Sequence, residues 1–118
     1  MIAENVNKEI FELKRKIIDN KYAILQNKMG LEKYERTLMG EIANTVGEDK
    51  KPLFSNMEKR QAEFERRSAE DKDYIVLKEY IQKLERDKDE MYAELEFKQN
   101  VFLIEIERIR LGMEGKQW

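Results

Sequence analysis

The chain of 118 residues contains neither histidine nor cysteine. Without histidine it lacks the usual general base near neutral pH. Without cysteine it lacks a thiolate nucleophile, a disulfide framework and the ligands of most zinc and iron sites. Its five glycines never form a G-x-G or G-x-x-x-x-G-K phosphate-binding loop, and no calcium-binding loop occurs. We therefore expect neither a metal nor a cofactor.

Long apolar runs are missing too. No stretch approaches the ~20 apolar residues that a membrane-crossing helix needs. The first ten residues, MIAENVNKEI, have neither the basic start nor the apolar core of a signal peptide. The lack of cysteine suits a reducing compartment. We expect a cytoplasmic protein that does not bind a membrane.

Charge is abundant but almost balanced. Charged residues make up 41% of the chain, hydrophobic residues also 41%, and the net charge is only -2. A compact single-core protein has little room for so many charges, whereas a long helical protein keeps most of its surface in water. Interleaved cations and anions are typical of salt-bridged helix faces and argue against nucleic-acid binding by bulk charge.

The first half of the chain has strong helical periodicity. Aliphatic residues recur every seven positions at heptad position a: Ile10, Ile17, Ile24, Leu31 and Leu38. Position d is then filled by Val6, Leu13, Asn20, Asn27 and Tyr34. This pattern predicts one helix over residues 4–46. The two asparagines either lie in the seam, where they set register, or face outward because the seam uses a neighbouring stripe of Phe11, Ile18 and Leu25.

The second half begins with a turn, predicted over residues 47–54, in which Gly47 suits a left-handed helix cap and Pro52 cannot continue a helix. A short helix over residues 55–70 follows, with a capping box from Ser55 to Glu58 and Phe54 as its staple residue.

A second apolar series then predicts a long helix over residues 73–112: Tyr74, Leu77, Ile81, Leu84, Met91, Leu95, Phe102 and Ile109. The apolar frame slips just before it. We expect a break there, with Asp71 or Asp73 as N-cap. One continuous helix with a stutter is the alternative. Residues 113–118 should fray.

Two long helices with facing seams fold back on each other. The fold class is therefore all-α: a single domain over residues 1–118, built as a long antiparallel, coiled-coil-like helical hairpin with a short middle helix. The expected register places Leu38 near Ile81, Ile24 near Leu95, and Ile10 near Ile109.

A two-helix layer buries only one side of each helix, and the segment VFLIEIERIRL, residues 101–111, is apolar on more than one side. Surplus apolar surface of this kind seeks another chain. We predict a homo-oligomer, with a dimer favoured. The candidate interface residues are Phe11, Ile18, Val101, Phe102, Ile104, Ile106 and Leu111. The alternatives are cover by the middle helix or a harmless exposed patch.

The middle segment carries a basic group that would meet phosphates or an acidic partner: Lys51, Lys59, Arg60, Arg66 and Arg67. Six basic and six acidic residues are interleaved over residues 47–70, which favours a solvated, salt-bridged surface instead. Carboxylates elsewhere have basic neighbours at helical spacing, and a thin hairpin offers no desolvated cleft to raise a pKa. We expect no enzyme.

The stretch KPLFSNMEKRQAEFERR, followed by EDKDYIVLKEYIQKLE, resembles a family of short all-helical proteins from bacterial prophages and mobile elements, whose mechanism is unassigned. The resemblance covers residues 51–85 and is carried by Ser55, Asn56, Lys59, Arg60, Arg67, Asp71, Tyr74 and Leu77. Lys72 stands where the family pattern has proline. The resemblance implies a phage-type origin and a setting in DNA recombination or replication, without an activity.

These observations predict a non-enzymatic interaction or scaffolding module with an unidentified protein partner. One alternative is a weak nucleic-acid-binding module that uses the basic middle segment. A second alternative is an inhibitor of a host defence protein, presenting the acidic face around residues 87–90.

Overall fold

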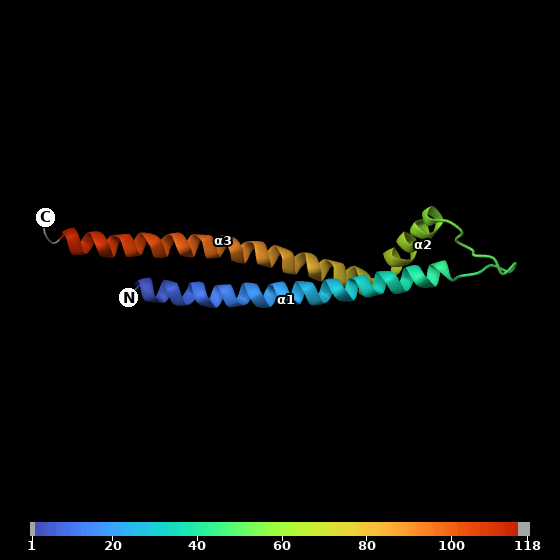
Figure 1. Cartoon of the computed structure of the whole chain (residues 1–118), viewed down its shortest axis with the longest axis horizontal. Helices are drawn as coiled ribbons and strands as arrows, with labels where there is room; N and C mark the ends of the chain where they lie inside the picture. Colours follow the sequence, from blue (N-terminus) through green and yellow to red (C-terminus); the bar gives the residue numbers. More distant parts are fainter. Residues whose placement is uncertain (1, 116–118) are drawn as a thin grey trace. The chain divides into compact units, whose positions relative to one another are not determined.

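Three helices make up nearly all of residues 2–115, the part of the chain that the computed structural model describes. They are α1 (Ile2–Ala43), α2 (Met57–Glu70) and α3 (Lys72–Gly115), shown in Figure 1. Among these residues the only β-type pairing is an isolated bridge between Val46 and Pro52. The long helices α1 and α3 run antiparallel and pack together, so the predicted all-α helical hairpin with a short middle helix is confirmed.

The chain divides into two compact units. The first combines residues 1–23 with residues 84–118, and the second comprises residues 24–83. Each unit contains an antiparallel stretch of α1 and α3, and the second also contains α2. The extent of a single domain, residues 1–118, stays a prediction.

The predicted seam of α1 is confirmed by burial. Ile10, Leu13, Ile17, Ile24 and Leu38 are buried, and Asn20 and Asn27 lie half-buried on the same side. The neighbouring stripe faces outward, since Phe11, Ile18 and Leu25 are all more than half exposed. The alternative seam is therefore wrong.

The core of the first unit joins α1 to the C-terminal half of α3. Its buried cluster consists of Ile10, Leu13, Ile17 and Leu95, with Val6, Met91 and Phe102 packed against it. Fully burying one such side chain stabilises the fold by about 1.5–3 kcal/mol. This small set of contacts therefore holds the two helices of the first unit together.

The register of the helices differs from the expected one. Ile10, expected near Ile109, instead shares a cluster with Leu95. In the second unit the ring of Tyr34 stacks on that of Tyr74, with 4.7 Å between centroids. The reason lies in α2. Its residues Gln61 and Phe64 line a groove with Glu35, Arg36 and Met39 of α1, so α2 takes the place beside the last turns of α1. Helix α3 therefore starts beside Tyr34.

The first helix ends at Ala43 rather than at residue 46. Past its end the amide of Thr45 donates to the carbonyl of Ile42 at 3.2 Å, a tighter turn than that of an α-helix, and Thr45 Oγ1 donates to the carbonyl of Glu41 at 2.7 Å. Gly47 is not left-handed as predicted; the positive φ, 64°, belongs to Lys50. The amide of Gly47 donates to the carbonyl of Lys51 at 2.9 Å, which closes a small hairpin-like loop. The left-handed conformation of Lys50 follows from the closure of this loop and not from helix capping.

The predicted N-terminus of the middle helix is wrong by two residues. The N-cap is Asn56, not Ser55, and its side chain accepts a hydrogen bond from the amide of Lys59 at 2.8 Å. Asparagine caps as well as serine does, so neighbouring cap residues compete and the tertiary context decides. Phe54 then stands two residues before the cap and is not the predicted staple.

The predicted break between the second and third helices is confirmed, and the continuous helix is wrong. Asp71 stands between α2 and α3 in an extended conformation, and its amide donates to the carbonyl of Ser68. Its Oδ1 accepts from the amides of Asp73 and Tyr74 at 3.1 and 3.2 Å. Of the two predicted N-cap residues, Asp71 and Asp73, it is Asp71 that caps α3. Helix α3 runs to Gly115 rather than to residue 112, so the first three residues of the predicted frayed tail, 113–115, belong to the helix. Residues 116–118 lie outside the described part of the chain.

Candidate interaction surface

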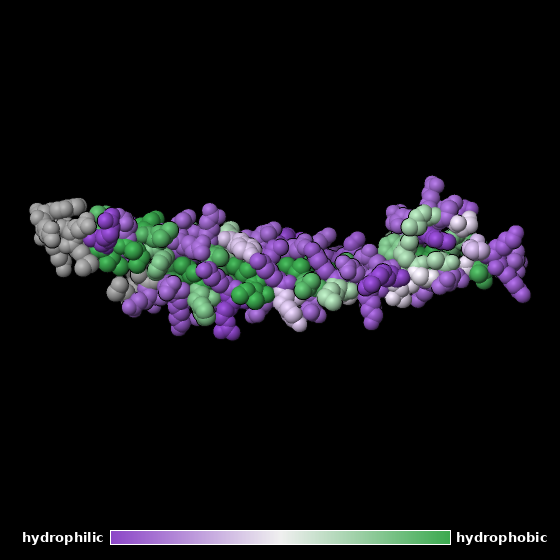
Figure 2. All heavy atoms as spheres, viewed as in Figure 1, coloured by the Kyte–Doolittle hydropathy of each residue, from purple (hydrophilic) through white to green (hydrophobic). Residues whose placement is uncertain are grey.

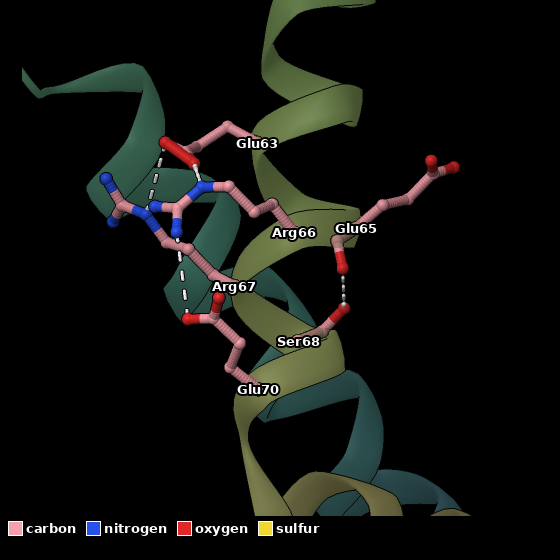
Figure 3. A network of polar contacts seen from close by, with 6 residues as sticks. All are labelled: Glu63, Glu65, Arg66, Arg67, Ser68 and Glu70. Carbon is pink, nitrogen blue, oxygen red and sulfur yellow. Dashed lines mark hydrogen bonds and ion pairs between the residues drawn. The ribbon is translucent and has the colours of Figure 1, made fainter.

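Two arginines of the middle segment converge on one carboxylate within α2. Figure 3 shows Arg66 and Arg67 pointing toward Glu63, whose side chain is only 9% exposed. Arg66 donates Nε to Glu63, and Arg67 Nε lies 3.6 Å from the same carboxylate. The hydrogen bond from Arg66 is the main reason that the pKa of Glu63 is lowered. This group stabilises α2 internally.

The remaining basic residues of that segment are divided between contacts and solvent. Arg60 donates Nε to the carbonyl of Phe54 at 3.0 Å, and the guanidinium of Arg67 lies 5.9 Å from the Phe54 ring centroid. Lys51 and Lys59 are exposed. Of the five predicted contact residues, the three arginines thus have partners inside the chain, which favours the salt-bridged interpretation over phosphate binding.

A polar groove runs between α1 and α3 in the first unit. Its acidic lining includes the predicted face around residues 87–90: Glu9, Glu12, Asp87, Glu90 and Glu94. Lys98 donates to Glu9 at 2.8 Å and lies 3.6 Å from Glu94, and the Glu9 hydrogen bond raises the pKa of Lys98. No group of three or more potential metal ligands in residues 2–115 is arranged to hold a metal ion.

One seam residue of this groove has an unmet polar atom. The side-chain carbonyl oxygen of Asn20 is buried and has no hydrogen-bond partner among the described residues. Such an atom costs about 1–3 kcal/mol of desolvation. The seam asparagine therefore weakens the packing of the first unit.

Apolar side chains gather at the C-terminal end of the described part of α3. We call residues 101–111 the α3 end. Leu103 is 63% exposed, Ile104 54% and Ile106 44%, and Leu111 is also exposed. Figure 2 shows this apolar surface beside the end of α3. Val101 is half-buried, and Phe102 packs against the core cluster.

Helix α1 does not reach the last part of the α3 end, residues 106–111. The ion pair places Lys98 opposite Glu9. Counting seven residues back along α1 reaches Ile2, where the helix begins, and seven forward along α3 reaches Glu105. Residues 106–115 of α3 therefore extend past the first residue of α1, as Figure 1 shows.

The predicted interface residues fall into two separate groups. Ile104, Ile106 and Leu111 lie together on the α3 end, whereas Phe11 and Ile18 lie on the outward face of α1. The sequence interpretation missed Leu103, which is among the most exposed apolar residues of the α3 end. Its signal was the unbroken apolar run from Val101 to Ile104, which no single seam can bury.

Comparison with known proteins adds no relative: no family model, no curated protein and no solved structure matches the chain. Within residues 2–115, no helix combines the length and the apolar character needed to cross a bilayer.

Proposed function

We propose that the protein is a non-enzymatic helical interaction module and that the α3 end is its docking surface. One observation carries the proposal. The stripe of α3 that packs on α1 through Phe102 continues, as Ile106 and Ile109, past the point opposite Ile2, the first residue of α1. An apolar stripe on a helix contributes favourable free energy only when another surface covers it.

The other surfaces support this choice. The basic segment and the acidic groove both use charges in contacts within the chain, through Arg66 with Glu63 and Lys98 with Glu9. The α3 end instead has four exposed apolar side chains close together in the sequence: Leu103, Ile104, Ile106 and Leu111. Burying this apolar area against a partner stabilises the complex by about 25 cal/mol per Å². The mobile-element setting stays a prediction.

Site-specific photocrosslinking in the producing cell tests the proposal. A benzophenone side chain at Leu103 should give a covalent adduct with a protein, because that position is on the docking surface. The matched control is Glu96, two turns earlier on the same face and also exposed. Adducts from position 103 and not from position 96 support the proposal. Equal adduct yields at both positions, or none at either, would contradict it.

A further inference from the structure

One side of α3 carries an apolar stripe that is separate from the seam. Phe97 and Ile104 are more than half exposed, Leu111 is exposed too, and the half-buried Val101 lies between the first two. Steps of three, four and seven residues place these four side chains on one side of the helix. The seam residue Leu95 is instead buried against α1.

The same stripe leads back into the polar groove of the first unit. Toward the N-terminus of α3, the steps of three and four residues from Phe97 reach Glu94 and Glu90. Both glutamates line the groove between α1 and α3. The groove and the apolar stripe therefore form one continuous face of the first unit. We call this the α3 groove face, and it comprises the groove lining with Phe97, Val101, Ile104 and Leu111.

The groove part of this face is acidic. Five carboxylates and two lysines line it, which leaves an excess of three negative charges. Lys98 pairs with Glu9 and Glu94. Within the described part of the chain, no ion pair holds the other three carboxylates of the lining, Glu12, Asp87 and Glu90. Cations from another molecule would complement them.

A buried acceptor in the lining adds to this demand for donors. Asn20 lines the same groove, and its Oδ1 is buried without a hydrogen-bond partner among the described residues. Carboxylates and amide oxygens accept hydrogen bonds, whereas lysine and arginine side chains only donate them. The groove has a volume of about 460 Å³, which is enough to admit such side chains.

A second copy of the chain does not supply these cations. Its own α3 groove face has the same excess of carboxylates. Two such faces would either oppose like charges or lay carboxylates on the apolar stripe, and both arrangements are unfavourable. Arg108, which follows Ile104 on the stripe, offers one cation against three unpaired carboxylates. The chemistry of this face therefore favours a different chain.

We propose that the α3 groove face binds an amphipathic helix of another protein that is rich in lysine or arginine at one end. This proposal rests on the proposed function, because it uses the α3 end, and it adds the chemistry of the partner. The apolar residues of that helix cover Phe97, Val101 and Ile104, and its basic end lies along the groove as far as Asp87. A helix of about 17 residues, roughly 26 Å long, spans this distance.

Two synthetic peptides test the requirement for charge. Both are helices of about 20 residues with leucine at steps of three and four. The first has lysines beside the leucines in one half, and the second has glutamine at the same positions. By fluorescence anisotropy at low salt, the parent should bind the lysine peptide on the order of tenfold more tightly than the glutamine peptide. Equal binding of the two peptides, or binding of neither, overturns the proposal.

Paired variants locate the charge. Glu12→Gln with Glu90→Gln should weaken binding of the lysine peptide on the order of tenfold and leave the glutamine peptide unaffected, because two charge pairs are lost. The matched control is Asp89→Asn with Glu96→Gln, since both residues are exposed and lie outside the groove lining. Circular dichroism should give both variants the helicity of the parent. Equal weakening by the two variants would show attraction by net charge alone and overturn the proposal.

A third variant separates this proposal from the proposed function. Phe97→Ser with Ile104→Ser should weaken binding of both peptides on the order of 100-fold, because apolar contacts are lost. If it does so while neither the lysines nor the groove variant matters, the α3 end stands as a docking surface and the basic partner is wrong. Sedimentation equilibrium of the parent without peptide examines the second copy. A dimer that this variant dissociates would assign the face to a second copy and overturn the proposal.

Discussion

The hydroxyl of Tyr34 donates a hydrogen bond to Oδ2 of Asp71 at 2.6 Å, across 37 residues of sequence. The same carboxyl group accepts the first free amides of α3 through its other oxygen. Tyr34 also stacks on Tyr74, which Phe64 of α2 meets edge-on at 6.2 Å. This contact links α1 to the start of α3 within the second unit and sets the register there.

Removing the hydroxyl should weaken the second unit. Tyr34→Phe keeps the stacked ring but deletes a hydrogen bond to a carboxylate, so we expect a loss of about 1–2 kcal/mol in the free energy of unfolding. The measurement is urea denaturation followed by circular dichroism. The control is Tyr80→Phe on the exposed face of α3, which should change the free energy by less than about 0.5 kcal/mol. Equal effects from both variants would show that the Asp71 contact is not stabilising.

Asp71→Ala should cost more stability than Tyr34→Phe. It removes the Tyr34 contact and the N-cap of α3 together, whereas Tyr34→Phe leaves the cap in place. The urea midpoints of the two variants, measured side by side with Asp73→Ala as the exposed control, decide the order. A midpoint for Asp71→Ala equal to or above that of Tyr34→Phe would contradict the shared-cap assignment.

Alkaline pH should destabilise the fold over a defined window. The hydrogen bond to Asp71 is the largest cause that raises the pKa of Tyr34 from 10.0 to about 12. The folded state thus holds this proton more tightly than the unfolded chain does. Its contribution is complete below pH 10 and is lost as the pH rises through about 12. Ultraviolet titration should show Tyr34 ionising late, and Tyr34→Phe should reduce the late phase to the part that comes from Tyr74, whose pKa is raised by burial. A parent titration complete near pH 10 would contradict it.

Two adjacent isoleucines provide a test of the seam. Ile17 belongs to the buried cluster, and Ile18 is 65% exposed on the other face. We expect Ile17→Ala to cost about 2–4 kcal/mol, because it removes buried methyl groups and leaves a cavity. Ile18→Ala should change the free energy of unfolding by less than about 0.5 kcal/mol. Urea denaturation of both variants measures this, and a reversed order would place the wrong face of α1 against α3.

The unmet oxygen of Asn20 predicts a stabilising substitution. Asn20→Leu replaces a buried, unbonded carbonyl by an apolar group in the seam, and we expect a gain of about 1 kcal/mol. The exposed Asn100 on α3 offers a control, because Asn100→Leu relieves no buried polar atom. Thermal and urea unfolding compare the two. Destabilisation by Asn20→Leu would contradict the prediction, and would show that the packing of the Asn20 side chain outweighs the cost of its unbonded oxygen.

Nucleic-acid binding through the middle segment should be undetectable or weak. With Arg60, Arg66 and Arg67 in contacts within the chain, two of the five predicted contact residues are left as exposed lysines, Lys51 and Lys59, beside the exposed Lys50. Few phosphate contacts give a low affinity and only a shallow dependence on salt. Fluorescence anisotropy with labelled single-stranded and double-stranded DNA at low salt measures this. Tight binding that is lost in Lys51→Ala with Lys59→Ala would favour the nucleic-acid alternative.

The helices and their buried stripes could be predicted from the sequence because they depend on local spacing. The seven-residue recurrence of Ile10, Ile17 and Ile24 identified the buried face of α1, and the slipped frame before Tyr74 identified the break at Asp71. These features repeat over many residues, so one misplaced side chain does not change the pattern. Local periodicity therefore defined the fold class.

The register and the helix ends could not be predicted in the same way. The register depends on where α2 packs and on the contact of Tyr34 with Asp71, which joins residues far apart in the sequence. The exposure of the α3 end follows from that register. The sequence predicted only that residues 101–111 have more apolar surface than one helix pair can bury. At the cap, Ser55 and Asn56 are chemically near-equivalent, so composition does not choose between them.

The sharing of Asp71 by two helices has a consequence for dynamics. Its amide ends α2 and its carboxylate begins α3, so neither terminus can open without disturbing the other. Amide protons in the last turn of α2 and the first turn of α3 should then exchange with solvent in one concerted event. The connection between α2 and α3, which contains neither glycine nor proline, therefore couples the opening of the two helix ends and does not act as a flexible hinge.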